Sequence, residues 1–313
     1  MRKRPLGKTG LSVSELSLGT WGLSGDGYGP VAEAEQDRVI DRAAALGITL
    51  FETADSYAHG AMERRLGERL SAESRARIVT KIGTDLDSAF PKKCFKVPYL
   101  EQALARSQER LKRDVLDVVL LHNPSSVALE KAEAAPWLAE QKAAGRIRAW
   151  GVSAGSEEVA REAIVRGAEV VSVAFNAFSA APMRLLEEEI QREDVGILAH
   201  SVLAYGLLAG HWGANKDFSD GDHRAERWTQ DELRQRVRQL DALRPLVGGS
   251  VMTMRAGALR YVLESKLVSS AVLGPRSSLQ LDQLVREAGK GPPYLEPDAL
   301  TAFEARLEEV GAV

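Results

Sequence analysis

Two short apolar runs decide the fold of this sequence: residues 115–123 read VLDVVLLHN, and residues 147–153 read IRAWGVS. The first run is almost continuous in apolar side chains, as a strand covered on both faces of a sheet must be. An alanine-rich stretch of helical length lies between the two runs. Strands that alternate with helices in this way are typical of a parallel sheet with crossover helices.

Six further runs share this character, and they occupy Glu15–Thr20, Ile48–Thr53, Ile78–Gly83, Val170–Asn176, Gly196–Leu203 and Val268–Gly274. Eight strands alternating with helices are the pattern of a (β/α)8 barrel, or TIM barrel. At 313 residues with 44% hydrophobic side chains, the chain can bury one large core. The sequence contains no internal repeat, low-complexity run or proline-rich linker. We therefore predict one α/β barrel domain over residues 1–313.

The helical period is clearest in the stretch that follows the third strand. Its apolar positions are spaced i, i+3, i+4, i+7 and i+11, which places them on one face of a helix. They are Leu100, Ala103, Leu104, Ser107 and Leu111. A similar stripe, expected to face the barrel wall, is formed by Val39, Ile40, Ala43 and Ala44.

Two additions to the plain barrel are expected. Before the first strand, a Lys-Thr-Gly turn between Leu6 and Leu11 predicts a small β-hairpin that plugs the bottom of the barrel. Between the seventh and eighth strands lie about seventy residues, which is more than one crossover needs. This insertion contains the polar and aromatic stretch 210–228 and two helical patterns. We predict that it forms a lid.

Composition narrows the class of protein. The 41 basic residues nearly cancel the 44 acidic ones, and the resulting charge of -3 argues against a nucleic-acid partner and for a small molecule. Cys94 is the single cysteine, which favours a reducing compartment. The N-terminus carries no apolar run, and no segment has the uncharged length of a membrane span. We expect a soluble, cytoplasmic protein, and the sequence leaves its oligomeric state open.

Polar side chains gather where the second, third and fourth strands end. FETADSY at residues 51–57 supplies Glu52, Asp55 and Tyr57, while VTKIG contains Lys81 and LLHNP contains His122. In a barrel, the carboxyl ends of the strands converge on one mouth, so these side chains can meet although they are distant in sequence. The pattern predicts a site that holds a carboxylate, a phenol, an ammonium and an imidazole.

These groups suit proton transfer to a carbonyl oxygen. A phenol with a pKa of about 10 is a poor acid at neutral pH. An adjacent ammonium, held by a carboxylate, favours the ionised phenol and improves it as a proton donor. Each group also has a purely structural explanation, because a Tyr or His at a strand end is often a hydrogen-bonded core residue and a Lys–Glu pair is often an ordinary ion pair.

The sequence resembles the aldo-keto reductase family over almost its whole length. The resemblance rests on LGKTGLSVSELSLGTWG at residues 6–22, on the ordered set ETADSY, VTKIG, LLHN and GVS, and on SVLAYGLLAG and LGPRSSLQL. The family has a catalytic tetrad of Asp, Tyr, Lys and His. Position for position, these fall on Glu52, Tyr57, Lys81 and His122. The resemblance implies that Tyr57 protonates the carbonyl oxygen as hydride arrives, with His122 polarising that oxygen.

The resemblance also implies a nicotinamide coenzyme, and no metal ion is expected. The residues implied in binding it are Gly19, Thr20 and Trp21 beside the nicotinamide, Ser153 at its carboxamide, Ser201, Leu203, Gly206 and Leu208 at the pyrophosphate, and Gly274, Arg276, Ser277 and Gln280 at the 2′-phosphate and adenine. Arg276 is a permanently charged planar donor that suits a 2′-phosphate, which favours NADPH over NADH. A solvated surface arginine is the alternative explanation of this residue.

Several positions depart from the family pattern. The asparagine of the carboxamide motif is Ala154, the glutamine of strand six is Ser172, and the stacking tyrosine is His200. Leu284 replaces an asparagine near the adenine. Each lost hydrogen bond to the carboxamide is worth roughly 0.5 to 1.5 kcal/mol net. The coenzyme is therefore expected to bind more weakly or the nicotinamide to tilt.

Three hypotheses about function follow. The first is an NADPH-dependent oxidoreductase that reduces an aldehyde or ketone. The second is a barrel that has drifted from hydride transfer to elimination, isomerisation or cyclisation, because the departures cluster around the reacting ring. The third is a non-catalytic subunit that keeps the coenzyme as a ligand. The substrate itself has no readable code in the lid loops.

Glu52 stands where the family has Asp, and its extra methylene adds roughly 1.5 Å of reach in a site where about 1 Å matters. Either the longer side chain folds back to pair with Lys81, or it reaches past Lys81 and acts as a base itself. We favour the first, because a buried ammonium without a carboxylate is costly. Asp55 is the other candidate partner of Lys81.

Overall fold

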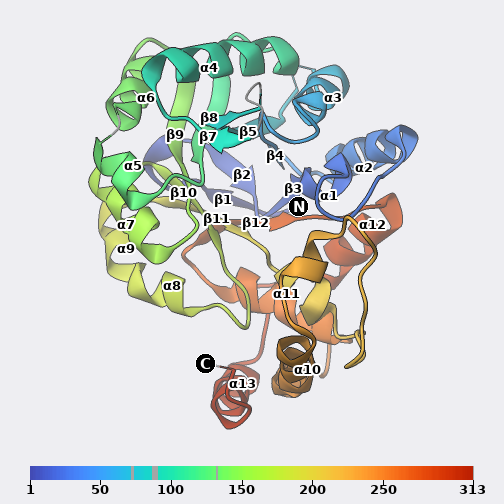
Figure 1. Ribbon diagram of the computed structural model, residues 1–313. Helices are drawn as coiled ribbons and strands as arrows, with labels where there is room; N and C mark the ends of the chain where they lie inside the picture. The colour runs from blue at the N-terminus through green and yellow to red at the C-terminus, as the bar shows by residue number, and fades with distance from the viewer. Residues whose placement is uncertain (72–73, 87–90, 132, 313) are drawn as a thin grey trace.

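A closed barrel of parallel strands forms the centre of the computed structural model, which describes residues 1–71, 74–86, 91–131 and 133–312 (Figure 1). Within these residues the barrel strands are β3 (Leu16–Gly19), β4 (Leu50–Glu52), β5 (Arg77–Ile82), β8 (Leu116–His122), β9 (Ile147–Ser153), β10 (Val170–Ala174), β11 (Gly196–His200) and β12 (Val268–Leu273). Each lies inside one of the runs predicted from the sequence, apart from Arg77 at the start of β5. The prediction of a (β/α)8 barrel is confirmed.

Helices cover the outside of the barrel (Figure 1). They are α1 (Trp21–Ser24), α2 (Glu33–Ala45), α3 (Ala61–Arg69), α4 (Val97–Leu111), α5 (Ser126–Lys131), α6 (Ala134–Ala143), α7 (Glu157–Val165), α8 (Ala181–Leu185), α9 (Glu187–Glu193), α11 (Met254–Glu264) and α12 (Ser278–Glu287). The predicted stripe of α4 is buried along its whole length. In α2 the prediction was wrong at Ala44, which is exposed, because it lies on the solvent side of Val39, Ile40 and Ala43.

The N-terminal hairpin closes the bottom of the barrel, as predicted. It consists of β1 (Lys3–Pro5), η1 (Gly7–Thr9) and β2 (Ser12–Ser14), with β1 and β2 antiparallel. Leu6 is fully buried and joins Leu50, Val118 and Leu198 in the cluster inside the barrel. Gly7 approaches the backbone so closely that a Cβ would lie 2.3 Å from the Asp194 carbonyl oxygen. The hairpin therefore packs closely against the bottom of the barrel.

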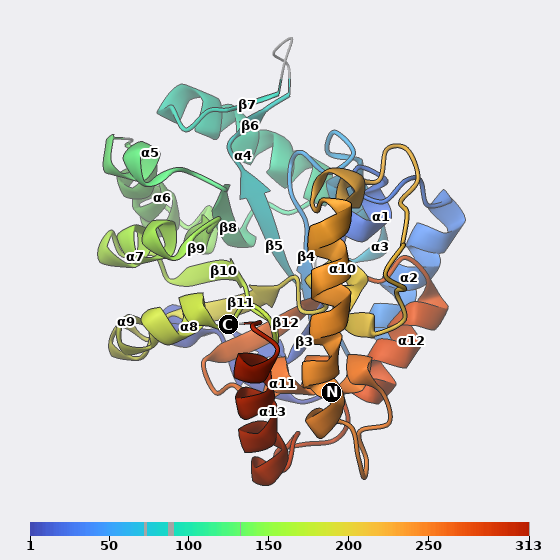
Figure 2. The same cartoon turned by 60° about the horizontal axis from the view of Figure 1, so that its bottom comes forward.

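The long connection between β11 and β12 forms the predicted insertion. It contains η2 (Ala204–Ala209), η3 (His223–Glu226), α10 (Gln230–Gln239) and η4 (Leu240–Leu246) before α11. Thr229 and Glu232 form a capping box that fixes the start of α10. The last helix, α13 (Pro297–Glu309), packs against η4, and Figure 2 shows α10 and α13 outside the barrel strands. The insertion thus has its own apolar core, distinct from that of the barrel.

A short antiparallel pair, β6 (Thr84–Asp85) and β7 (Lys92–Lys93), follows β5. Cys94 comes next and donates its backbone N–H to the Gly83 carbonyl at 3.0 Å.

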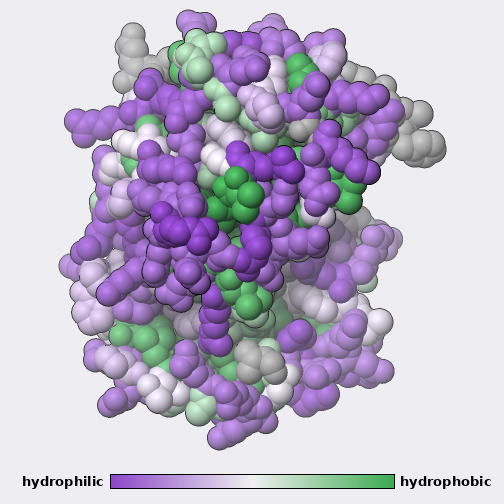
Figure 3. Space-filling model, turned by 90° about the vertical axis from the view of Figure 1, so that its left-hand side faces the viewer, coloured by the Kyte–Doolittle hydropathy of each residue, from purple (hydrophilic) through white to green (hydrophobic). Residues whose placement is uncertain are grey.

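The face of the molecule in Figure 3 is mainly hydrophilic, with small separate hydrophobic patches. Every helix in the described part of the chain is too short or too polar to cross a membrane.

Candidate active site

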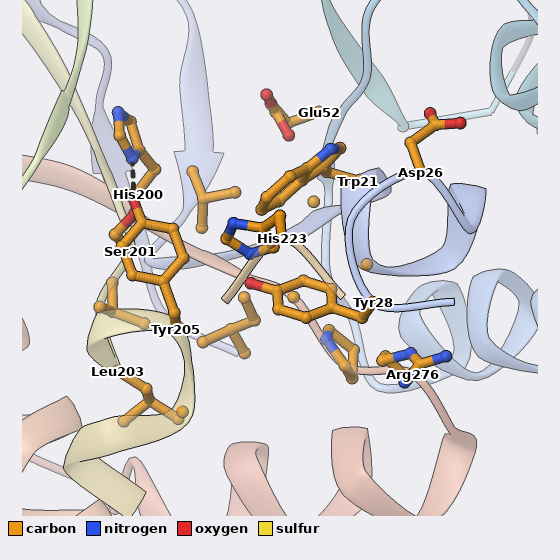
Figure 4. Close-up of a pocket in the computed structure, with 18 of the residues that line it drawn as sticks. Trp21, Asp26, Tyr28, Glu52, His200, Ser201, Leu203, Tyr205, His223 and Arg276 are labelled. Carbon is orange, nitrogen blue, oxygen red and sulfur yellow. Dashed lines mark hydrogen bonds between the residues drawn. The ribbon is translucent and has the colours of Figure 1, made fainter. Parts of the chain in front are cut away.

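A cavity of about 850 Å3 opens at the carboxyl ends of the barrel strands. Strand ends from β3, β4, β5, β8, β9, β11 and β12 contribute to its wall, together with the loop after β3 and the insertion. Figure 4 shows Glu52 toward one end and Arg276 toward the other, with Trp21, His223 and Tyr28 between them. The volume lies in the upper part of the range of small-molecule sites.

The four predicted catalytic residues come together at one end of this cavity. Glu52 ends β4, Tyr57 lies in the turn that follows, Lys81 is on β5 and His122 ends β8. The Lys81 ammonium donates to the Tyr57 hydroxyl oxygen at 2.9 Å and to the Thr53 carbonyl at 3.1 Å. It also forms an ion pair with the Glu52 carboxylate. The chain therefore holds a phenol, an ammonium and a carboxylate in one connected row.

The longer Glu52 side chain pairs with Lys81 in place of reaching past it. Gly19 makes room for the carboxylate, since a Cβ at this position would lie 3.1 Å from Glu52 Oε2 and 2.7 Å from Val272 Cγ1. No ion pair joins Asp55 to Lys81 within the described residues. Asp55 is buried, and burial followed by the nearby Glu63 carboxylate raises its pKa to about 7. Asp55 therefore does not take the place of Glu52.

Burial controls the protonation of the row. It raises the pKa of the Tyr57 phenol above its ordinary value. The ammonium contact expected from the sequence is present, but desolvation of the phenolate outweighs it, so Tyr57 is a neutral, protonated phenol. Burial, then the charge of Lys93, also lowers the pKa of Lys81, which is ion-paired with the Glu52 carboxylate. Tyr57 forms a phenolate favourably only when an acceptor takes the phenolic proton and the Lys81 ammonium balances the negative charge that is left on the phenolate oxygen.

His122 completes this end of the cavity as a neutral imidazole. Burial, then the charges of Lys81 and Lys93, lower the pKa of His122 well below its ordinary value. Its Nδ1 lies 3.4 Å from the Ser56 hydroxyl oxygen, and its ring meets the Tyr57 ring edge to face at 6.0 Å between centroids. A neutral imidazole beside the phenol can donate one N–H to a carbonyl oxygen without adding charge.

Most residues implied in coenzyme binding line the same cavity: Gly19, Trp21, Ser153, His200, Ser201, Leu203, Gly206, Gly274, Arg276 and Gln280. The other four lie behind its wall. Leu208 is fully buried in the core of the insertion, and the Ser277 hydroxyl caps the start of α12. The hydroxyls of Thr20 and Ser172 are buried without a hydrogen-bond partner among the described residues. Because both residues are fully buried and absent from the cavity lining, neither hydroxyl is open to a ligand in the cavity.

The carboxamide position contains a group that the sequence did not reveal. Ala154 is buried and offers no amide. Asn123, directly after His122, lines the cavity in a left-handed backbone conformation with φ of 50°. The Ser153 hydroxyl donates to Asn123 Oδ1 at 2.9 Å, so the amide nitrogen of Asn123 stays available. Asn is one of the few non-glycine residues that adopt this conformation readily, and its side chain places an amide group on the cavity wall beside Ser153.

His200, in place of the stacking tyrosine, lies on the wall of the cavity at the end of β11. Its Nδ1 lies 3.0 Å from the Ser201 hydroxyl oxygen, the contact drawn in Figure 4. Burial, then the charges of Lys81 and Arg227, lower its pKa to about 4. The ring is therefore neutral at physiological pH and offers a flat uncharged face.

Arg276, at the far end, is tied to the loop before α2. Its Nη2 donates to the Gly29 carbonyl at 2.9 Å and to the Pro30 carbonyl at 3.1 Å. Its buried Nε has no hydrogen-bond partner in the described part of the chain. Its backbone N–H donates to Gln280 Oε1 at 2.8 Å. The guanidinium keeps donor capacity on the cavity wall although one arm is already engaged.

The insertion closes over the cavity through contacts that local sequence patterns did not show. The His223 backbone N–H donates to the Gly27 carbonyl at 2.9 Å, and its ring lies 4.7 Å from Trp21 and 4.9 Å from Tyr28. Arg224 pairs with Asp222 and lies over the Tyr28 ring at 4.8 Å. His59 and His211 also reach the wall. The sequence predicted a lid but could not show which residues it contacts, because the contacting segments lie about 200 residues apart in the chain.

The family model described as "Aldo/keto reductase family" matches residues 15–289 of the chain. Among curated proteins, a pyridoxal 4-dehydrogenase of Microbacterium luteolum is 26% identical, with 90% of this chain and 92% of that protein covered. An NADH-specific methylglyoxal reductase of Escherichia coli (strain K12) is 27% identical, covering 91% of this chain and 93% of that protein. These relatives are oxidoreductases by name.

Solved structures give the same fold. An aldo-keto reductase of Bacillus halodurans in its holo form superposes with a TM-score of 0.81 at 23% identity, covering 98% of this chain and 96% of its own. A glycerol dehydrogenase of Gluconobacter oxydans gives a TM-score of 0.85 at 23% identity, covering 99% and 96%. The overall fold is thus shared with proteins of quite different sequence.

Proposed function

Because the chain belongs to the aldo/keto reductase family, we propose that it is a reductase that converts a small aldehyde or ketone to an alcohol with hydride from NADPH. The observation that carries the proposal is the Lys81 ammonium, which contacts the Tyr57 hydroxyl and pairs with Glu52 on the cavity wall. The same arrangement serves the reverse reaction, in which the phenolate accepts the proton of an alcohol.

In the proposed reaction the coenzyme supplies the hydride, and the chain supplies the proton. Tyr57 donates its phenolic proton to the carbonyl oxygen. Lys81 stabilises the phenolate that forms, because its ammonium is already within hydrogen-bond distance. Neutral His122 donates an N–H to the same oxygen and draws electrons from the carbonyl carbon. Proton donation by a positioned side chain contributes typically 10²- to 10⁴-fold to a rate.

The residues present fit a nicotinamide coenzyme. The Asn123 side chain lines the cavity beside Ser153, and neutral His200 offers a stacking face on the same wall. Arg276 favours NADPH, because its permanently charged guanidinium lines the opposite end of the cavity without a carboxylate partner among the described residues. We place the reaction in the cytoplasm, since Cys94 is the single cysteine of the sequence.

We propose that the substrate is a small compound that is either planar or short. Trp21, Tyr28, Tyr205 and His223 line the cavity as one packed aromatic cluster in which His223 contacts the other three rings at 4.7 to 5.3 Å. The named substrates of the relatives, pyridoxal and methylglyoxal, supply two compounds for a panel of aromatic and aliphatic aldehydes.

The test is oxidation of NADPH and NADH, followed by absorbance, with this panel. We expect turnover with at least one aldehyde and a loss of about 10²- to 10⁴-fold in kcat for Tyr57→Phe. Tyr261→Phe is the matched control, because Tyr261 packs between Phe175 and Phe303 away from the cavity wall. Full activity of Tyr57→Phe would contradict the proposed role.

A further inference from the structure

The first turn of α2 is bonded to the start of α12, close to the proposed adenosine end of the cavity. Glu35 Oε1 accepts a hydrogen bond from the Ser278 backbone N–H at 2.7 Å and from the Ser278 hydroxyl at 3.0 Å. Its other oxygen, Oε2, accepts from Arg38 Nε at 2.7 Å. Ser278 is the first residue of α12. The carboxylate therefore occupies the first free N–H of this helix.

The start of a helix attracts anions, because its unpaired N–H groups and its dipole are positive. At α12 this attraction is already used. The Ser277 hydroxyl accepts from the Gln280 N–H at 3.2 Å, and Glu35 takes the Ser278 N–H. The Ser278 hydrogen bond, then Arg38, holds the pKa of Glu35 below its usual range, so Glu35 is charged at neutral pH.

Glu35 lies behind the residues that would meet a 2′-phosphate. Arg276 precedes Ser278 by two residues and Gln280 follows it by two, and both line the cavity, whereas Glu35 does not. A phosphate on Arg276 would thus gain the attraction of one guanidinium and feel the repulsion of the Glu35 carboxylate behind the same turn, a repulsion that the ion pair of Glu35 with Arg38 reduces. Charges within about one Debye length, ~8 Å at physiological ionic strength, interact appreciably.

Two other arginines on this cavity wall, Arg255 and Arg224, are balanced by acidic side chains. Arg255 donates to both Glu287 oxygens, at 2.5 and 2.6 Å. Arg224 is paired with Asp222. Arg276 has no carboxylate partner among the described residues and relies on backbone carbonyls. Arg227 also lines the wall without a carboxylate partner in the described part of the chain, but it lies over the Tyr205 ring at 3.5 Å. Arg276 is therefore the unpaired arginine beside Ser278.

We propose that Glu35 is a coenzyme-specificity residue that opposes Arg276 and keeps the preference for a 2′-phosphorylated coenzyme small. The proposal rests on the proposed function and deepens it: the chain accepts adenosine with a free 2′-hydroxyl nearly as well as adenosine 2′-phosphate, so NADH serves beside NADPH. Removing the charge of Glu35, while its hydrogen-bond acceptor stays, shifts the preference toward NADPH by about 3- to 10-fold.

The experiment compares adenosine 2′,5′-bisphosphate with 5′-AMP, which differ by the 2′-phosphate alone, by isothermal titration calorimetry. In the wild-type protein we expect the two Kd values to agree within about tenfold. Glu35→Gln should tighten the bisphosphate by about 3- to 10-fold and leave 5′-AMP within twofold, because only the former has a charge to be repelled. The gain should shrink at 0.5 M salt, where screening is stronger.

Three variants separate charge from structure. Glu35→Asp keeps the charge and should keep the wild-type ratio of Kd values. Glu33→Gln removes a carboxylate from the same turn, but one that is exposed and paired with Arg65, and should change neither ligand. Arg276→Ala should weaken the bisphosphate and spare 5′-AMP. Titration of NADPH and NADH, followed by fluorescence, should give the same order.

An unchanged ratio of Kd values in Glu35→Gln, or an equal change for both ligands, would overturn the role of Glu35. A wild-type ratio far above tenfold in favour of the bisphosphate would do the same. Failure of the proposed function has a different signature: the wild-type protein would bind both nucleotides and both dinucleotides with the predicted ratios, yet no aldehyde would oxidise either coenzyme.

Discussion

The two ends of the nicotinamide region differ in how closely they keep the residues of the family. At the reacting end, Tyr57, Lys81 and His122 match the family pattern, and Glu52 differs from its Asp by one methylene. At the carboxamide end, Ala154, Ser172 and His200 have all replaced larger or more polar groups. We infer from this difference that the proposed proton-transfer row tolerates little change because its members contact one another, and we propose that coenzyme contacts are redistributed to neighbours such as Asn123.

Breaking the row at its centre should have the largest effect. Lys81→Met removes the donor to Tyr57 and leaves Glu52 buried without a cation. We expect loss of activity by more than about 10²-fold and destabilisation by about 3 to 5 kcal/mol, the usual result of breaking a buried pair. Enzyme assay and denaturant unfolding measure the two effects.

The double variant Lys81→Met with Glu52→Leu is the control for this prediction. It removes both charges, so it should recover much of the stability while activity stays lost. Recovery of activity together with stability would show that the row acts only as structural support.

The carboxamide end should show its difference in the pH dependence of stability. The pKa of His200 is lowered to about 4 from 6.5. The unfolded chain therefore binds more protons than the folded one below pH 6.5, and stability is lost as the pH falls toward 4. The loss is at most about 1.4 kcal/mol per pH unit. Compared with wild type, His200→Phe should lose less free energy of unfolding between pH 7 and pH 4.5.

Asp55 works in the opposite direction over a similar range. Its pKa is raised to about 7, so its contribution to stability is present at low pH and is lost as the pH rises through 7. Subtracting the pH dependence of unfolding free energy of Asp55→Asn from that of wild type should isolate the contribution of Asp55.

Identical pH dependences of unfolding free energy for wild type and His200→Phe would contradict a neutral, buried His200.

The redistribution of carboxamide contacts is tested at Asn123. Asn123→Ala removes one hydrogen bond, worth about 0.5 to 1.5 kcal/mol, so we expect NADPH and NADH to bind about 2- to 10-fold more weakly by fluorescence titration. ADP-ribose, which lacks the nicotinamide, should bind as before. Ala154→Asn in the Asn123→Ala background should restore dinucleotide binding. An equal loss for ADP-ribose would mean that Asn123 supports the fold rather than the carboxamide.

The smallest effect is expected at Glu52. Because Glu52 already pairs with Lys81 beside Gly19, Glu52→Asp keeps the charge, and we expect kcat to change by less than about tenfold. Steady-state kinetics with the best aldehyde of the panel measures it. A complete loss of activity in Glu52→Asp would indicate that the longer side chain is itself a chemical group in the reaction.

The barrel and the reacting end were predictable because each depends on local patterns. The strands are continuous apolar runs, and their carboxyl ends must converge, so Glu52, Lys81 and His122 could be placed together without coordinates. Boundaries shifted where strand ends fray: the run predicted over Glu15–Thr20 pairs only over Leu16–Gly19.

The missed features are contacts between segments far apart in the chain. Glu35 meets Ser278 across 243 positions, and His223 meets Gly27 across nearly as many. Asn123 was passed over because its role depends on a left-handed φ and on the Ser153 hydroxyl, neither of which has a sequence pattern. Ala44 was misassigned because a small apolar residue fits either side of a helix equally well.

The central claim, hydride transfer with Tyr57 as proton donor, is tested most directly by isotope transfer. NADPH with deuterium at either face of nicotinamide C4 is mixed with each aldehyde of the panel, and the products are read by mass spectrometry. The account predicts an alcohol with one deuterium on its carbinol carbon, from one of the two labelled faces, at a rate that collapses in Tyr57→Phe. A product formed without deuterium and without oxidation of NADPH would contradict it and would point to non-redox acid–base chemistry at the same residues.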